Sequence, residues 1–164
     1  MRKHALTTAL TTLGVASAAA LAATTGASAS TKSEHFSLVT TSTADGPPVF
    51  SVVATGAFTD GGTASHDGDG GLTLHLTAGT ITLHGTVEHH QVTTTQTPTA
   101  CLQTAATSLS YTLGLGTGAY AGISGSGEAR DDDVFVQQVV NGACSPDDAS
   151  AQGIVTASGS VALP

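Results

Sequence analysis

Apolar residues recur at every second position over most of the chain after residue 30, most clearly in the segments 50–58, 72–76, 109–115 and 155–163. A period of two is that of a β-strand with one buried face. In the third of these segments the alternation places Leu115 on the buried face. The pattern predicts an all-β protein of about seven or eight short antiparallel strands, and it leaves a sandwich and a closed barrel open.

The apolar runs on either side of Ala78-Gly79 predict a β-hairpin. If these two residues form the turn, Leu76 lies opposite Ile81 and Leu74 lies opposite Leu83. Burial of one face then fixes the register of the two strands, because a slip by one residue would turn every apolar side chain outward.

Three polar segments predict loops or sheet edges. Residues 60–71 are rich in Gly and Asp, and we expect a loop there. The Thr-rich segment 92–99 contains Pro98, which cannot donate a ladder hydrogen bond, so this segment is expected to be a weaker strand or an edge loop. The acidic run 131–133 is expected to be a solubilising loop before a strand over 134–140.

The first 29 residues predict a signal peptide. Basic residues at positions 2–4 precede an uncharged, Ala- and Leu-rich stretch over 5–23, and the small-residue pattern at 27–29 suits a signal peptidase. A membrane anchor is the alternative for a stretch of this length, but its many Thr residues and the cleavage pattern favour a removed signal. We therefore expect a secreted, extracellular protein in which 30–164 is a single domain without an integral membrane segment.

An exported protein folds in an oxidising compartment, where Cys101 and Cys144 can form a disulfide. We expect a disulfide between them. A reactive thiol is the alternative, but neither cysteine belongs to a CxxC motif or has an adjacent basic residue.

Composition excludes several classes of function. The 164 residues include 4 Lys or Arg against 12 Asp or Glu, for a formal charge of −8. Nucleic-acid binding needs a basic face, so we do not expect this protein to bind nucleic acid. No glycine-rich nucleotide loop with a βαβ unit and no GxSxG elbow around Ser124 or Ser126 is found, so we expect no cofactor and no hydrolase nucleophile.

Two groups of residues are candidates for a metal site. His75 and His84 share a face of the predicted hairpin, and the adjacent pair His89-His90 follows. The segment 66–71 resembles half of a calcium loop. Neither group has a third ligand at a suitable spacing, so surface histidines, a solvated loop and no metal are the expectation.

The most specific run in the chain is a glycine-rich segment around Tyr120, with the pattern GTGxYxGxxGxG. Its glycines permit positive φ and close backbone approach, so that Tyr120 can fold back as a plug where two strands meet. The glycines that we expect to form this structural turn are Gly116, Gly118, Gly122, Gly125 and Gly127.

This run resembles the turn of allene oxide cyclase-like and dirigent-like proteins, especially their small exported actinobacterial relatives. The resemblance covers 114–127 well and 53–163 loosely. It implies an antiparallel, closed β-barrel of about eight strands with a central cavity. No catalytic residue of that family aligns to a specific position of this chain, so only the structural turn is carried over.

We expect a non-catalytic secreted protein that binds a small apolar ligand in its cavity, with Tyr111, Tyr120 and Asp132 contacting the ligand. A cyclase or isomerase of the allene oxide cyclase or dirigent type is the alternative, in which Tyr120 or an acid near Asp132 contacts the substrate. A cell-envelope interaction protein with Thr-rich strands is a further alternative. The sequence leaves the oligomeric state open.

Overall fold

The computed structural model describes residues 30–42, 47–67 and 71–163, and these form an all-β protein. Eight antiparallel strands make a ring in which each strand pairs with the next and β1 also pairs with β8. The strands are β1 (Lys32–Ser42), β2 (Val49–Gly56), β3 (Asp60–His66), β4 (Leu72–Leu76), β5 (Gly79–Gln96), β6 (Ala100–Gly116), β7 (Ser124–Val140) and β8 (Ala143–Ala162). The all-β, antiparallel expectation is confirmed.

Helical structure in the described ranges is limited to one 3-10 turn, η1 (Gly118–Tyr120), between β6 and β7. No helix in that part of the chain is long and apolar enough to cross a membrane. The predicted signal peptide, residues 1–29, lies outside the described residues.

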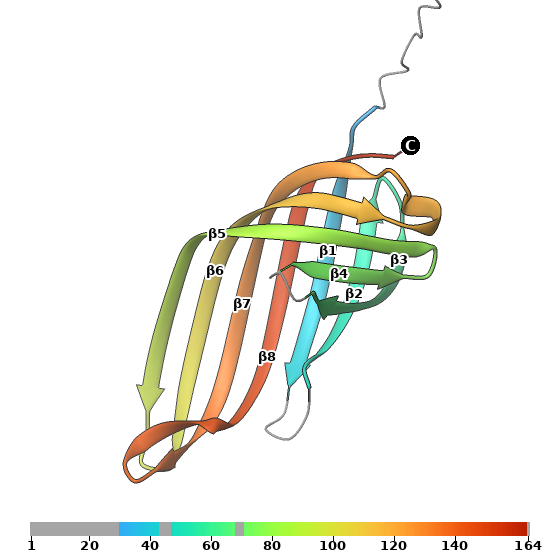
Figure 1. Cartoon of the computed structure of the whole chain (residues 1–164). Helices are drawn as coiled ribbons and strands as arrows, with labels where there is room; N and C mark the ends of the chain where they lie inside the picture. The colour runs from blue at the N-terminus through green and yellow to red at the C-terminus, as the bar shows by residue number, and fades with distance from the viewer. Residues whose placement is uncertain (1–29, 43–46, 68–70, 164) are drawn as a thin grey trace, which may run out of the picture.

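The two halves of the ring differ in strand length. Strands β5 to β8 have 18, 17, 17 and 20 residues, whereas β2, β3 and β4 have 8, 7 and 5. Figure 1 shows the four long strands reaching well past the short ones, so that one end of the ring continues as a curved four-stranded sheet. Cys101 and Cys144 form a disulfide in this extension, with Cα atoms 5.7 Å apart.

Alternation places the core on one face of every strand. Even-numbered residues of β1 and β2 and odd-numbered residues of β6 and β8 are the buried ones. The side chains exposed by 2% or less are Phe36, Leu38, Val52, Ala54, Leu74, Ile81, Cys101, Val161 and Glu34. All but Glu34 are apolar, so burial of one face explains the alternation seen in the sequence.

The hairpin between β4 and β5 forms in a different register from the predicted one. Leu74 lies opposite Ile81, and Leu76 lies opposite Gly79, so the turn is Thr77-Ala78 and the predicted pairs were two positions off. The carboxylate of Asp60 accepts hydrogen bonds from both backbone N–H groups of this turn, at 3.2 and 3.0 Å. This distant side chain fixes the turn, and the local sequence does not reveal it.

The prediction for Leu115 was wrong, because this side chain is 86% exposed. A register shift in the β5–β6 pairing lies between the pairs of Ile81 and Leu83, at this end of β6. The extra residue of a bulge reverses which face the following side chains occupy.

The loop predictions for 60–71 and 131–133 were wrong over most of these residues, whereas the weaker-strand alternative for 92–99 is confirmed over 92–96. Residues 60–66 form β3, and 92–96 continue β5 up to the turn that contains Pro98. The acidic run 131–133 lies in the middle of β7. Long-range pairing with neighbouring strands therefore overrides the weak strand propensity of Gly and Asp in 60–66 and 131–133.

Candidate functional site

A cavity of about 370 Å³ lies inside the ring and is lined by residues of all eight strands. The apolar lining comes from Leu38, Pro48, Phe50, Leu72, Leu83, Leu109, Ala129, Phe135, Ala151, Val155 and Ala157. The polar side chains in the lining are Thr40, Ser42, His66, Tyr111, Asp131 and Asp133. A mostly apolar concave space with a few polar groups is the usual form of a small-molecule site.

Tyr120 closes the ring at the end away from the disulfide. Its side chain is 4% exposed, and its ring lies 4.7 Å from that of Phe58, centroid to centroid. The hydroxyl donates a 2.6 Å hydrogen bond to the carboxylate of Asp60. Tyr120 therefore acts as the plug expected from the glycine-rich run, but it does not line the cavity.

The glycines around Tyr120 either adopt positive φ or leave no room for a side chain. Gly118 and Gly122 have φ of 61° and 85°, a region that favours glycine. A Cβ at Gly116 would overlap the carbonyl oxygen of Tyr120, and one at Gly125 would overlap that of Ser160. The turn thus brings the chain back over the end of the ring.

Asp60 joins the plug to the β4–β5 turn. Besides Tyr120, its carboxylate accepts hydrogen bonds from the hydroxyl and the backbone of Thr77 and from the backbone of Ala78. The hydroxyls of Thr77 and Tyr120 hold the pKa of Asp60 well below its ordinary value. Burial and the Asp60 carboxylate raise the pKa of Tyr120. The network keeps this end of the ring closed.

Glycines on the neighbouring strands make room for Tyr111 inside the ring. Tyr111 pairs with Gly127, which pairs with Gly159 on the next strand. A Cβ on Gly159 would come within 2.7 Å of the Tyr111 hydroxyl oxygen. Tyr111 is 3% exposed, and its hydroxyl has no hydrogen-bond partner within the described structure. It forms the floor of the cavity.

Glu34 is fully buried beside this floor. The Phe58 N–H donates a 3.1 Å hydrogen bond to Oε2, whereas Oε1 has no partner among the described residues. Burial raises the pKa of Glu34 in spite of the backbone N–H groups that lower it. Burial, and to a smaller extent the Glu34 charge, raise the pKa of Tyr111. Glu34 does not line the cavity.

Asp131 and Asp133 supply the acidic groups of the cavity wall. Their side chains share one face of β7, because the two positions differ by two. Burial raises the pKa of Asp131 to about 6, with Asp133 and Asp132 adding to the shift and His66 opposing it. Burial and Asp132 also raise the pKa of Asp133, whereas His90 lowers it. A Cβ on Gly153 would overlap the Asp133 carboxylate, so this glycine makes room for it.

Asp132 was predicted to contact the ligand, but the structure places it on the outer face of β7. There its carboxylate pairs with the guanidinium of Arg130, with N–O distances of 2.7 and 2.8 Å, and both side chains are exposed. The ion pair lowers the pKa of Asp132. Of the three predicted ligand contacts, Tyr111 alone lines the cavity, and the acids that do so are the two neighbours of Asp132.

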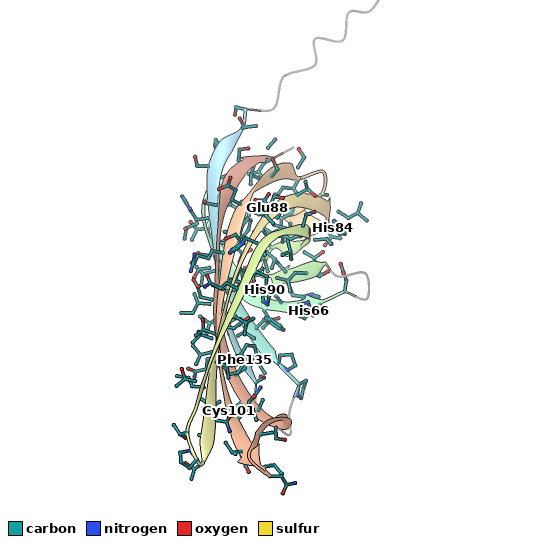
Figure 2. The ribbon with its side chains drawn as sticks, turned by 90° about the vertical axis from the view of Figure 1, so that its left-hand side faces the viewer. His66, His84, Glu88, His90, Cys101 and Phe135 are labelled. Atoms are coloured by element: carbon teal, nitrogen blue, oxygen red, sulfur yellow. A yellow bond between two sulfur atoms is a disulfide. The ribbon has the colours of Figure 1, made fainter. Side chains whose placement is uncertain are left out.

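Aromatic side chains flank the open end of the cavity. The Phe50 ring meets the His66 imidazole edge to face, with centroids 5.1 Å apart. Figure 2 shows His66 and Phe135 in the middle part of the molecule and Cys101 farther toward the tip of the long strands. The cavity therefore lies between the plug and the extension that carries the disulfide.

The other histidines of the described ranges do not line the cavity. His75 is exposed and shares a 2.9 Å hydrogen bond with Ser65, and His90 shares one of 2.8 Å with Thr107. In the ranges that the structure describes, no group of three or more His, Cys, Asp or Glu side chains is arranged to hold a metal ion. Part of the calcium-like segment, residues 68–70, lies outside those ranges.

Comparison with known proteins gives no relative: no protein-family model, no curated protein and no solved structure matches the chain.

Proposed function

We propose that the ring is a closed β-barrel of the allene oxide cyclase or dirigent type, and that the protein is a secreted, non-catalytic binder of a small, largely apolar molecule. The observation that carries this proposal is the cavity of about 370 Å³, which is open at one end, mostly apolar and lined from every strand. The disulfide supports an oxidising, extracellular setting.

The packing at the two ends of the ring supports the same function. Tyr120, Phe58 and Asp60 fill the closed end, whereas the space beyond Tyr111 is left empty. Native interiors are close-packed, and an apolar void of this size that served only the fold would cost stability. A bound ligand would fill this space and offset that cost.

The test is binding of N-phenyl-1-naphthylamine, an uncharged apolar dye whose fluorescence rises in apolar surroundings. Two variants reduce the cavity: Ala129→Leu in its wall near Leu109 and Ala151→Phe opposite Phe135. Val53→Leu is the matched control, because Val53 is 53% exposed on the outer face of β2.

We expect the dye to bind the parent protein and the Val53→Leu control equally, and to bind each cavity variant at least about tenfold more weakly. Circular dichroism establishes that the variants are folded. Dye binding that is absent, or that is the same in all four proteins, would overturn the proposal.

A second candidate is a cyclase- or isomerase-like enzyme, and the observation that favours it is Asp131. A carboxyl group in a cavity wall with a pKa of about 6 is suited to general acid or base catalysis near neutral pH. Native mass spectrometry of the protein purified from its source would identify a bound molecule. Turnover of that molecule, abolished in Asp131→Asn, would establish this candidate in place of the non-catalytic one.

A further inference from the structure

The wall of the cavity is acidic. Asp131 and Asp133 line it, whereas neither Lys nor Arg does. Of the two Lys and Arg residues in the described ranges, Lys32 is exposed at the start of β1, and Arg130 is already paired with Asp132 outside the ring. A concave wall with low-polarity sides concentrates such a field in the space that a ligand would occupy.

The two cavity carboxylates lack a strong cationic partner within the described structure. The imidazoles of His66 and His90 oppose the rise in the pKa of Asp131 and of Asp133, respectively, but burial and the neighbouring carboxylates outweigh them. Partial burial of two like charges on adjacent inward positions destabilises the empty protein. A cation placed between them would relieve that cost.

The aromatic side chains of the cavity wall suit a cation independently of the acids. Tyr111 is 3% exposed and forms the cavity floor with its ring, because its hydroxyl is fully buried against Gly159 and does not reach the cavity space. Phe50 and Phe135 add aromatic rings to the wall, which attract cations through their faces.

We infer that the molecule bound in this cavity carries a protonated amine on an apolar body, with the ammonium held by the carboxylates of Asp131 and Asp133. The inference rests on the proposed binding function and names the chemical class of its ligand. The apolar body occupies the deeper space beside Leu109, Ala129 and Ala157. An ammonium–carboxylate hydrogen bond is about twice as strong as a neutral one, so the acids fix the orientation of the ligand.

Other ligand classes fit less well. A carboxylate or phosphate ligand would meet two negative side chains and no Lys or Arg in the wall. A neutral ligand would displace water from Asp131 and Asp133 and give neither of them a counter-charge. An apolar amine fills the space and neutralises the wall.

The test uses three naphthalene compounds of similar size and different charge: 2-naphthylmethylamine, which is protonated at neutral pH, 2-naphthylmethanol and 2-naphthoate. Calorimetry on the full secreted chain measures their dissociation constants at pH 7.5, beside the dye used above. We expect the amine to bind at least about tenfold more tightly than the alcohol, and the naphthoate to bind more weakly than both.

Substitutions of the two acids test whether the preference for the amine arises in the cavity. Asp131→Asn and Asp133→Asn should each reduce the amine preference several-fold while the alcohol binds as before. Glu128→Gln is the matched control, because Glu128 is exposed on the outer face of the same strand, and it should leave the preference unchanged.

The outcomes separate this inference from the function on which it rests. If the dye and the alcohol bind but the amine has no advantage, the ligand class is wrong and the binding function stands. An amine preference that survives both cavity substitutions would also overturn the inference. If neither the dye nor any naphthalene compound binds, the proposed function fails, and the ligand class fails with it.

Discussion

The hydroxyl of Tyr120 donates a 2.6 Å hydrogen bond to the carboxylate of Asp60, a residue sixty positions earlier in the chain. The same carboxylate holds the turn between β4 and β5 through Thr77 and Ala78. One buried aromatic side chain and one acid thus close one end of the ring.

Tyr120→Ala is expected to lower the free energy of unfolding by about 3–5 kcal/mol, because it removes a buried aromatic ring that packs on Phe58. Tyr120→Phe keeps the ring, loses only the hydrogen bond to Asp60 and should cost much less. Urea unfolding monitored by circular dichroism measures both. Equal losses in the two variants would contradict the packing role of the ring.

Gly159→Ala is expected to cost about 1–3 kcal/mol, because the new methyl group would overlap the Ser126 carbonyl oxygen and come within 2.7 Å of the Tyr111 hydroxyl. Gly61→Ala is the control: it also lies in a strand, but the nearest heavy atom to its new Cβ is Val52 O at 3.4 Å. Thermal unfolding compares the two. A Gly159→Ala protein as stable as Gly61→Ala would show that this glycine does not make room for Tyr111.

Reduction of the disulfide is expected to lower the free energy of unfolding by up to about 4 kcal/mol, since Cys101 and Cys144 are 43 positions apart and their bond restricts the unfolded chain. Urea titrations with and without reductant measure the loss. The Cys101→Ala/Cys144→Ala double variant should be insensitive to reductant. A parent protein whose unfolding midpoint does not move on reduction would contradict this prediction.

Asp131 is expected to make stability depend on pH in the acid-to-neutral range. Its pKa is raised from an ordinary value of 3.8 to about 6, so the folded state holds the proton more tightly than the unfolded state. The stabilisation is complete below about pH 4 and is lost as the pH rises through about 6. Asp131→Asn should therefore be more stable than the parent at pH 7 by about 1 kcal/mol, after allowance for solvent screening at the open end.

Unfolding free energies of the parent and Asp131→Asn at pH 4, 5, 6 and 7 measure this effect. The parent should lose stability relative to the variant between pH 4 and 6. A difference that is constant over the series would show that Asp131 titrates in the folded protein as it does in the unfolded chain.

The strands and their buried faces could be predicted from the sequence, because one-sided burial leaves a period of two that is visible locally. The hairpin register could not, since the turn at Thr77-Ala78 is set by hydrogen bonds to Asp60, which the sequence assigned to a loop. Leu115 was misplaced for a similar reason: a bulge in the β5–β6 pairing interrupts a pattern that reads as continuous.

From the sequence, the wrong acid of the run 131–133 was predicted to be the ligand contact. The acidic run was expected to contribute Asp132, whereas the structure turns Asp131 and Asp133 inward and pairs Asp132 with Arg130. Phe135 lines the cavity and lies two positions after Asp133, so the same face of β7 carries both side chains. This aromatic residue could have identified the inward face from the sequence. The signal was hidden because Val134 and Val136 on the other face are also apolar, although they are 42% and 50% exposed.

A crystal structure of the protein soaked with 2-naphthylmethylamine would show directly whether the cavity binds an apolar amine. We expect electron density for one molecule inside the ring, with its naphthalene group above Tyr111 and its nitrogen within hydrogen-bond distance of Asp131 or Asp133. A ring interior filled by the protein's own side chains, or a compound bound only on the outer surface, would contradict it.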